Sequence, residues 1–215
     1  MHKSPKAKLA SAESLHRLAL YHCLLTDFLL CGKKITTSKE IASKLGLNES
    51  TVRRDLSLTG NAPGKRGIGY DASSLRQRIG DFLALPPFAP FAMVGSVAVA
   101  TAVFNFFPVE KFGFVPIAFF SEEPGDWGKA INGREVRPVD DISPALTSLG
   151  VNVALVACHP SWVQYSINLL SQAGIKSILV LTQSVLASAP QGVHLAHIGI
   201  ACELKSLFYF ADSKF

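Results

Sequence analysis

Residues 37–71 constrain the fold of this chain more than any other stretch, because two short helices and a glycine-rich basic segment follow one another there. In residues 38–45 the apolar side chains recur at helical spacing, and Gly46 ends the predicted helix. A second helix is predicted to begin near Glu49, with Asn48 accepting free amides as its N-cap. Two short helices joined by a tight turn are typical of a helix-turn-helix, whose second helix enters the major groove of DNA.

The second predicted helix has two faces of different chemistry. Val52 and Leu56 share one face and can pack inward, whereas the outer face is short, polar and basic. Hydroxyl groups suit phosphates or base edges, and either Arg53 or Arg54 can bind guanine with two hydrogen bonds. The residues of the two helices that are predicted to contact DNA are Lys39, Ser50, Thr51, Arg53 and Arg54.

The basic segment that follows, GKRGIGY from Gly64 to Tyr70, is predicted to form a wing. Its glycines allow the positive φ angles of a tight hairpin, which places the two cations at the tip, against phosphate or a minor groove. The predicted contacts are Lys65, Arg66, Gly67 and Tyr70. The alternative is an ordinary solvated face and a plain loop. Turn, cap, arginine pair and basic hairpin occur together and in order, which favours DNA binding.

The chain resembles the Rex family of bacterial redox-sensing transcriptional repressors in two motifs, TVRRDLS from Thr51 and GKRGIGYD from Gly64. Rex proteins join a winged helix-turn-helix to a Rossmann domain that reads the NADH/NAD+ ratio. The similarity extends more loosely from about Leu15 to Phe210. The resemblance implies a cytoplasmic homodimeric repressor that is not an enzyme, binds a double-stranded operator with palindromic half-sites and has NAD(H) as its ligand.

The distribution of charge also indicates two modules. Residues 1–83 hold 14 Lys and Arg against 7 Asp and Glu, whereas residues 84–215 hold 7 against 9. A basic first part and a slightly acidic second part favour a polyanion contact on the first. The predicted divisions are a disordered basic arm at 1–13, a winged-helix DNA-binding domain at 14–85, a Rossmann domain at 86–200 and a dimerisation helix at 201–215.

The fold class that this pattern predicts is α/β, with a parallel Rossmann-type sheet after the winged helix. Apolar runs at 114–121, 151–157 and 177–181 read as strands, and residues 142–149 and 161–173 read as helices between them. The terminal helix carries an apolar set that is unsuited to a free tail, Leu204, Leu207, Phe208 and Phe210. In the Rex family the corresponding helix is exchanged between two subunits, which implies a swapped dimer here.

One stretch leaves a membrane-tethered regulator open as an alternative. Residues 82–109 contain no Asp, Glu, Lys or Arg, and residues 88–107 are long enough to cross a bilayer. Against a single span, prolines crowd its first third and Gly95-Ser96 lies where a strand would turn into a helix. A buried strand followed by a sheet-covering helix explains the same composition, so no membrane partner is predicted.

A dinucleotide site is predicted where that strand turns into that helix. A Rossmann domain holds pyrophosphate on a helix N-terminus after G-x-G-x-x-G/A, and this chain has Val97 at the second glycine position. A β-branched side chain there is expected to project into the volume that the pyrophosphate needs. The residues predicted to bind the cofactor are Gly95, Ser96, Val97, Ala98, Val99, Ala100, Ser121, Glu122 and His159.

Two further positions depart from the Rex pattern. The acidic residue expected for the adenosine ribose falls near Phe120, and the nearest acids are Glu122 and Glu123. An aspartate that in Rex proteins helps to communicate cofactor state matches Gly199 here. Two possibilities therefore stay open: the site still binds NAD(H) with altered affinity, or it has lost the dinucleotide.

Enzymatic and metal chemistry have little support in the sequence. A Rossmann oxidoreductase is the enzymatic alternative, but it needs an intact phosphate turn and a general acid or base. Cys158 and His159 are adjacent, yet neighbours on a strand face opposite ways, so no catalytic pair is predicted. The four cysteines are expected to be mostly buried thiols, and they lack metal-ligand spacing, as do the histidines.

Overall fold

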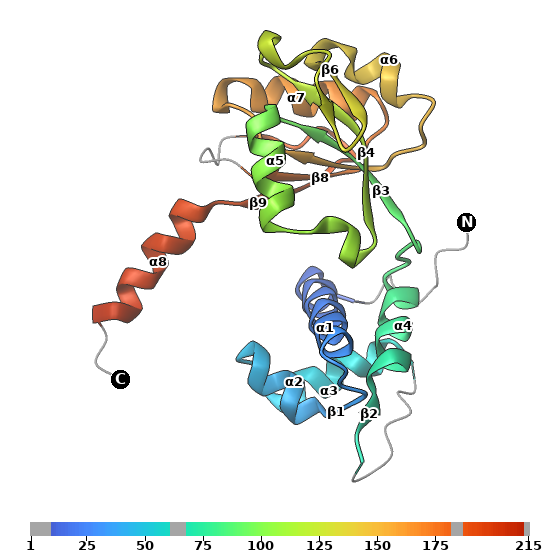
Figure 1. The fold of residues 1–215 in the computed structure, drawn as a ribbon. Coiled ribbons are helices and arrows are strands. Elements are labelled where there is room, and N and C mark those ends of the chain that lie inside the picture. Colours follow the sequence, from blue (N-terminus) through green and yellow to red (C-terminus); the bar gives the residue numbers. More distant parts are fainter. Residues whose placement is uncertain (1–9, 61–67, 182–186, 213–215) are drawn as a thin grey trace. The chain divides into compact units, whose positions relative to one another are not determined.

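The computed structural model describes residues 10–60, 68–181 and 187–212. The chain divides into two compact units, Met1–Phe88 and Ala89–Phe215 (Figure 1). The N-terminal unit contains α1 (Ala12–Leu30), β1 (Ile35–Thr36), α2 (Ser38–Leu45), α3 (Glu49–Leu58), β2 (Tyr70–Asp71) and α4 (Ala72–Phe82). Helix α1 begins inside the arm that was predicted at 1–13, because the hydroxyl of Ser11 accepts the backbone N–H of Ser14 and caps the helix.

The helices of the N-terminal unit enclose one apolar core. Its side chains are almost fully buried and include Leu18, Tyr21, Leu25, Ile41, Val52, Leu56, Leu75 and Ile79. On α1, Tyr21 is fully buried in this core, whereas Ala19 is exposed. An aromatic ring fills more of the core than a methyl group, so Tyr21 anchors α1 against the other helices.

The C-terminal unit is an α/β fold, as predicted. Its strands are β3 (Ala89–Val94), β4 (Phe114–Ser121), β5 (Ala130–Ile131), β6 (Arg134–Pro138), β7 (Val153–Val156), β8 (Ser177–Leu181) and β9 (His194–Ile198). Its helices are α5 (Val97–Phe106), α6 (Ile142–Leu146), α7 (Pro160–Gln172) and α8 (Ile200–Asp212), with 3₁₀ turns at Val109–Phe112, Pro124–Asp126 and Val139–Asp141. The short hairpin of β5 and β6 was not predicted.

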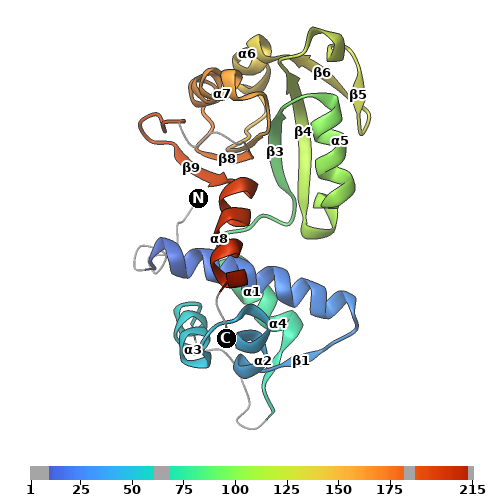
Figure 2. The same ribbon diagram turned by 90° about the vertical axis from the view of Figure 1, so that its left-hand side faces the viewer.

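The sheet has the order β5-β6-β4-β3-β7-β8-β9, and every pairing is parallel except that of β5 with β6. Alternate residues of β3 face opposite sides. Phe91 and Met93 join the cluster that contains Ala100 of α5, whereas Ala92 and Val94 join the cluster that contains residues of α6 and α7. Helices thus cover both faces of the sheet (Figure 2), as expected for a doubly wound fold.

The uncharged stretch at 82–109 divides between these elements. Residues 88–107 form β3 and then α5, which are separated by Gly95 and Ser96. Within residues 10–60, 68–181 and 187–212, no helix combines the length and the apolar character that crossing a bilayer requires.

Candidate DNA-binding surface and dinucleotide crevice

The turn between α2 and α3 is formed by a glycine in the left-handed region. Gly46 has φ of 64°, a conformation that costs glycine little, and its N–H donates to the carbonyl of Ala42. Thr37 caps the start of α2 by accepting the N–H of Glu40 at 3.1 Å. Asn48 stands at the N-cap of α3, but the prediction that its side chain caps the helix is wrong, since it forms no such bond.

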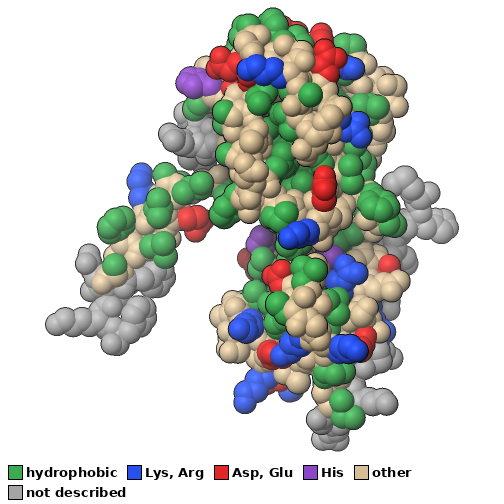
Figure 3. Space-filling view, in the orientation of Figure 1, with side chains coloured by type: hydrophobic (Ala, Val, Ile, Leu, Met, Phe, Trp, Pro, Cys, Tyr) green, Lys and Arg blue, Asp and Glu red, His purple; other side chains and the backbone are tan. Residues whose placement is uncertain are grey.

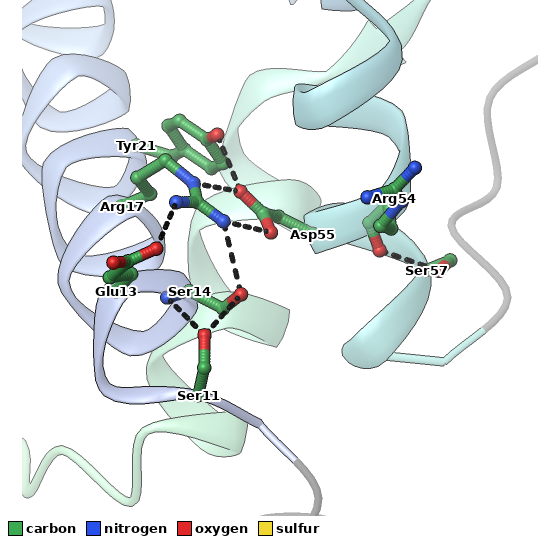
Figure 4. A network of polar contacts seen from close by, with 8 residues as sticks. All are labelled: Ser11, Glu13, Ser14, Arg17, Tyr21, Arg54, Asp55 and Ser57. Carbon is green, nitrogen blue, oxygen red and sulfur yellow. Dashed lines mark hydrogen bonds and ion pairs between the residues drawn. The ribbon is translucent and has the colours of Figure 1, made fainter.

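An ion pair between the partly buried Arg17 and the buried Asp55 fixes how α3 lies on α1 (Figure 4). Arg17 donates from Nε to Asp55 Oδ2 at 2.6 Å and from a terminal nitrogen to Oδ1 at 2.9 Å. The hydroxyl of Tyr21 donates to the same Oδ2 at 2.9 Å. Asp55 is only 1% exposed, and a two-pronged pair of this kind holds both partners in one orientation.

The charge of Asp55 is maintained in spite of its burial. Burial raises the pKa of this carboxyl, but the hydrogen bonds from Arg17 and Tyr21 outweigh that effect, so the pKa lies below its usual range. Sequence reasoning missed this pair. The available signal was that Asp55 lies three positions after Val52 and therefore falls on the inner face of α3.

The two arginines of α3 are in different environments. Arg53 donates to Glu49 Oε1 at 2.6 Å and to Ser38 Oγ at 3.2 Å. Arg54 is exposed, and its guanidinium forms no hydrogen bond or ion pair with any residue that the structure describes. Figure 4 shows the Arg54 side chain directed away from the Arg17–Asp55 pair. Arg54 is therefore the arginine of the pair that is available to a ligand.

The other predicted contacts on the two helices are accessible to different degrees. Lys39 and Ser50 are exposed and Thr51 is half-buried. Ser38, which the sequence did not single out, is buried and bonds to both Glu49 and Arg53. In the space-filling view, Lys and Arg side chains are spread over the visible face of the N-terminal unit (Figure 3).

The base of the predicted wing is the antiparallel pair of β1 and β2. Thr36 lies opposite Tyr70. Gly69 has φ of +102°, and a Cβ there would come within 2.3 Å of the carbonyl oxygen of Thr36, so only glycine lets the ribbon close at this point. Tyr70 is half-buried against the core. Lys65, Arg66 and Gly67 lie outside the described residues, and their role at the tip stays a prediction.

In the C-terminal unit, the N-terminus of α5 is occupied by a carboxylate of the chain itself. Asp126 Oδ2 accepts the backbone N–H of Val97 at 2.8 Å and the hydroxyl of Ser121 at 3.1 Å. Lys129 donates to Asp126 Oδ1 at 3.0 Å. Sequence reasoning missed Asp126, which lies in a 3₁₀ turn after β4 with no pattern to place it.

Only part of the predicted glycine motif has the features of a phosphate-binding turn. Gly95 has φ of +157°, and a Cβ there would lie 2.6 Å from the carbonyl oxygen of Ala157, so β3 and β7 themselves require this glycine. Ser96 caps α5 by accepting the N–H of Val99 at 3.3 Å. The side chain of Val97 packs partly against the cluster that contains Met93. Less of it therefore projects into the volume expected for the pyrophosphate than the sequence predicts. Ala98 is exposed and Ala100 is buried.

The predicted residues at the ends of β4 and β7 bond to one another. Ser121 is buried at the end of β4, and Glu122 Oε1 accepts the backbone N–H of His159 at 2.8 Å. The second oxygen of Glu122 is buried without a hydrogen-bond partner in the described part of the chain. Glu123 is exposed. Glu122 thus connects the end of β4 to the segment after β7, although β3 lies between these two strands in the sheet. Whether it serves as the acid expected near Phe120 stays a prediction.

His159 and Cys158 do not form a pair. The ring Nδ1 of His159 lies 2.8 Å from Ser161 Oγ and accepts the N–H of Ser161, so the imidazole caps α7. Cys158 is buried beside Ser166, and burial raises the pKa of its thiol to about 12. A neutral thiol is a poor nucleophile.

The remaining cysteines correct one expectation. Cys23, Cys31 and Cys202 are exposed, although most of the cysteines were expected to be buried. The described ranges contain no group of three or more His, Cys, Asp or Glu that could hold a metal ion.

Helix α8 begins at Ile200, and the carbonyl of Gly199 accepts the N–H groups of Cys202 and Glu203 at its start. Its apolar side chains are largely in solvent, with Ile200 and Phe208 each 72% exposed. Leu204 and Leu207 are exposed as well, and Figure 3 shows hydrophobic side chains along this helix. The side chain of Phe210 lies outside what the structure describes.

Three comparisons relate the chain to known proteins. Residues 11–57 match the family model described as "Putative DNA-binding protein N-terminus". The "Redox-sensing transcriptional repressor Rex 1" of Thermotoga maritima is 33% identical over 76% of this chain and 78% of its own length. The corresponding repressor of Rhodopirellula baltica is 28% identical over 95% of this chain and 85% of its own.

A solved structure agrees over nearly the whole chain. It is the crystal structure of RSP, a Rex-family repressor, in complex with β-NAD+ and operator DNA. The TM-score is 0.80 at 25% identity, with 95% of this chain and 93% of that chain covered.

Proposed function

Because this chain belongs to the Rex family of redox-sensing transcriptional repressors, we propose that it is a repressor that binds operator DNA through its N-terminal unit. The observation that carries the proposal is the outer face of α3, which is held in place by the Arg17–Asp55 pair. On that face Ser50 and Arg54 are exposed, and the guanidinium of Arg54 has no partner among the described residues. A solvent-facing, unpaired arginine on the second helix of a helix-turn-helix is suited to a guanine edge or a phosphate.

The predicted contacts have separate roles in this proposal. Ser50, Thr51 and Arg54 read bases or nearby phosphates in the major groove, whereas Lys39 and the wing cations Lys65 and Arg66 position the protein on the backbone. Backbone contacts contribute affinity without sequence information. Arg53 assists through its contacts to Glu49 and Ser38, which order the start of α3.

The repressor acts as a homodimer in this proposal. Helix α8 leaves a mostly apolar surface in solvent, formed by Ile200, Leu204, Leu207 and Phe208. A second copy of the chain has the same surface and can cover it. Two subunits related by a twofold axis match palindromic half-sites about one helical turn or a multiple apart. A ligand that changed the angle between the subunits would shift the population that fits those half-sites.

DNA binding is tested with the purified full chain and a duplex selected by that chain from a random-sequence pool. Fluorescence anisotropy at several salt concentrations is expected to show log K falling with log salt, by about 0.9 for each phosphate neutralised. Sedimentation of the same complex is expected to give two chains per duplex. Failure to enrich any duplex would contradict DNA binding, and one chain per duplex would contradict the dimer.

No reaction is assigned to this protein. The raised pKa of Cys158 and the capping role of His159 leave no activated nucleophile at the end of β7. The relative with the solved complex binds β-NAD+ as well as operator DNA. For the present chain, the contacts of Asp126 at the α5 N-terminus weigh against the same ligand. We place the protein in the cytoplasm, where its operator would be.

A further inference from the structure

The start of α5 is the place where a Rossmann domain holds the negative charge of a dinucleotide. Free N–H groups and the positive end of the helix dipole make such a terminus an anion site. In this chain the first of these amides, Val97 N–H, already donates to Asp126. The third, Val99 N–H, donates to the hydroxyl of Ser96. Ala98 has the one amide of the three that lacks a partner among the described residues.

Asp126 is held by a complete set of donors. It is 9% exposed and receives hydrogen bonds from a backbone amide, the Ser121 hydroxyl and the Lys129 ammonium. Burial raises the pKa of this carboxyl, but the bonds from Val97, Lys129 and Ser121 outweigh it and lower the pKa below its usual range. The group is therefore an anion at neutral pH, and it satisfies the helix terminus in the way that a bound phosphate would.

A second carboxylate adds to the negative charge of the crevice. Glu122 lies at the adjoining end of β4 and accepts the His159 amide with one oxygen, while the other oxygen is buried and unpaired in the described ranges. A pyrophosphate entering here would meet two carboxylates, with Lys129 already engaged by one of them. Like charges at short range are unfavourable, and their repulsion is stronger where water is excluded.

We propose that Asp126 is an internal anion that occupies the pyrophosphate position of the Rossmann crevice, so that this protein does not bind NAD(H) and its affinity for operator DNA is independent of the NADH/NAD+ ratio. The residues present do not fit the cofactor of the family. The first half of the proposal concerns the crevice alone, and the second half rests on the proposed DNA binding.

The direct test is calorimetric titration of the full-length protein with NADH and with NAD+. The wild-type chain is expected to show no binding up to about 1 mM ligand. Asp126→Ala frees the Val97 amide and the Ser121 hydroxyl and removes one like charge, so it is expected to strengthen NADH binding at least about tenfold. Asp126→Asn keeps an acceptor for the Val97 amide without the charge. Its affinity for NADH is expected to lie between those of the wild-type chain and Asp126→Ala.

The matched control is Glu123→Ala. Glu123 is an exposed acid in the same loop, so its removal changes the net charge equally but leaves Asp126 and its donors intact. It is expected to behave as wild type towards both nucleotides. Should Asp126→Ala fail to fold, as judged by circular dichroism, the wild-type titration still decides the claim. Micromolar binding of NADH by the wild-type chain would overturn the proposal.

The second half is measured separately, as affinity for the selected duplex with and without NADH. An unchanged affinity is expected, and a change of tenfold or more would contradict the uncoupling. A protein that bound neither NADH nor DNA would leave the crevice proposal standing and count against the proposed function, so the two failures are distinguishable.

Discussion

The two units of this chain differ in how they use a buried aspartate. In the N-terminal unit Asp55 pairs with Arg17 behind α3, and the guanidinium of Arg54 on the outer face is left without a partner in the described residues. In the C-terminal unit Asp126 is bonded at the end of α5 itself, at the position where a ligand would bind. A carboxylate behind a binding helix orients that helix, whereas a carboxylate at its N-terminus competes with the ligand.

Asp55→Ala is expected to have the largest effect, because it leaves the partly buried Arg17 with only the exposed carboxylate of Glu13 as a counter-ion. We expect the N-terminal unit to lose about 3 kcal/mol of unfolding free energy. Both tryptophans, Trp127 and Trp162, lie in the C-terminal unit. Urea unfolding followed by helical circular dichroism should therefore shift while the tryptophan fluorescence transition stays in place.

The matched comparison for that change is Asp126→Ala, which should instead shift the tryptophan transition. Its loss of stability is expected in the tryptophan fluorescence transition, because Asp126 holds α5 to the loop after β4. If Asp55→Ala shifted the tryptophan transition as well, the two units would not be energetically separate and the comparison would fail.

Arg54→Ala is expected to weaken operator binding about 10- to 100-fold without changing stability, because it removes an exposed guanidinium and no internal contact. Arg53→Ala is expected to weaken binding less, since Arg53 already donates to Glu49 and Ser38. Anisotropy titrations with the selected duplex compare the two. Arg137→Ala, an exposed arginine of the C-terminal unit, is the control of equal charge. If Arg54→Ala and Arg137→Ala lost the same operator affinity, the effect would come from net charge alone and not from a contact of Arg54.

The smallest expected effect is the dependence of stability on pH. The folded-state pKa values of Asp55 and Asp126 lie below their usual range. Their contribution to stability is therefore complete above the unfolded value of about 3.9 and is lost as the pH falls through the folded values.

Unfolding measured at pH 7 and at pH 3 should show this loss in both spectroscopic signals. Asp55→Asn should flatten the dependence seen by circular dichroism, and Asp126→Asn should flatten that seen by tryptophan fluorescence. A wild-type protein equally stable at both pH values would argue against charged, bonded carboxylates at either place.

Local pattern was enough to predict most of the helices and strands, although not the hairpin of β5 and β6. The periodicity of residues 38–45 and the turn glycine Gly46 predicted the helix-turn-helix, and the alternation of apolar runs predicted the parallel sheet. Strands β4 and β8 have the predicted bounds. The side chain of Asn48 was wrongly predicted to cap α3, because residue type gives a preference and not a bond.

The sequence by itself determined the two modules, the basic face of α3 and the break in the glycine motif at Val97, since each depends on residues close together along the chain. Only the tertiary structure decided the partners of Asp55 and Asp126. Arg17 and Asp55 are 38 positions apart, and Val97 and Asp126 are 29 apart. The pairing of such distant charges is set by how the helices and strands pack, and no local periodicity encodes it.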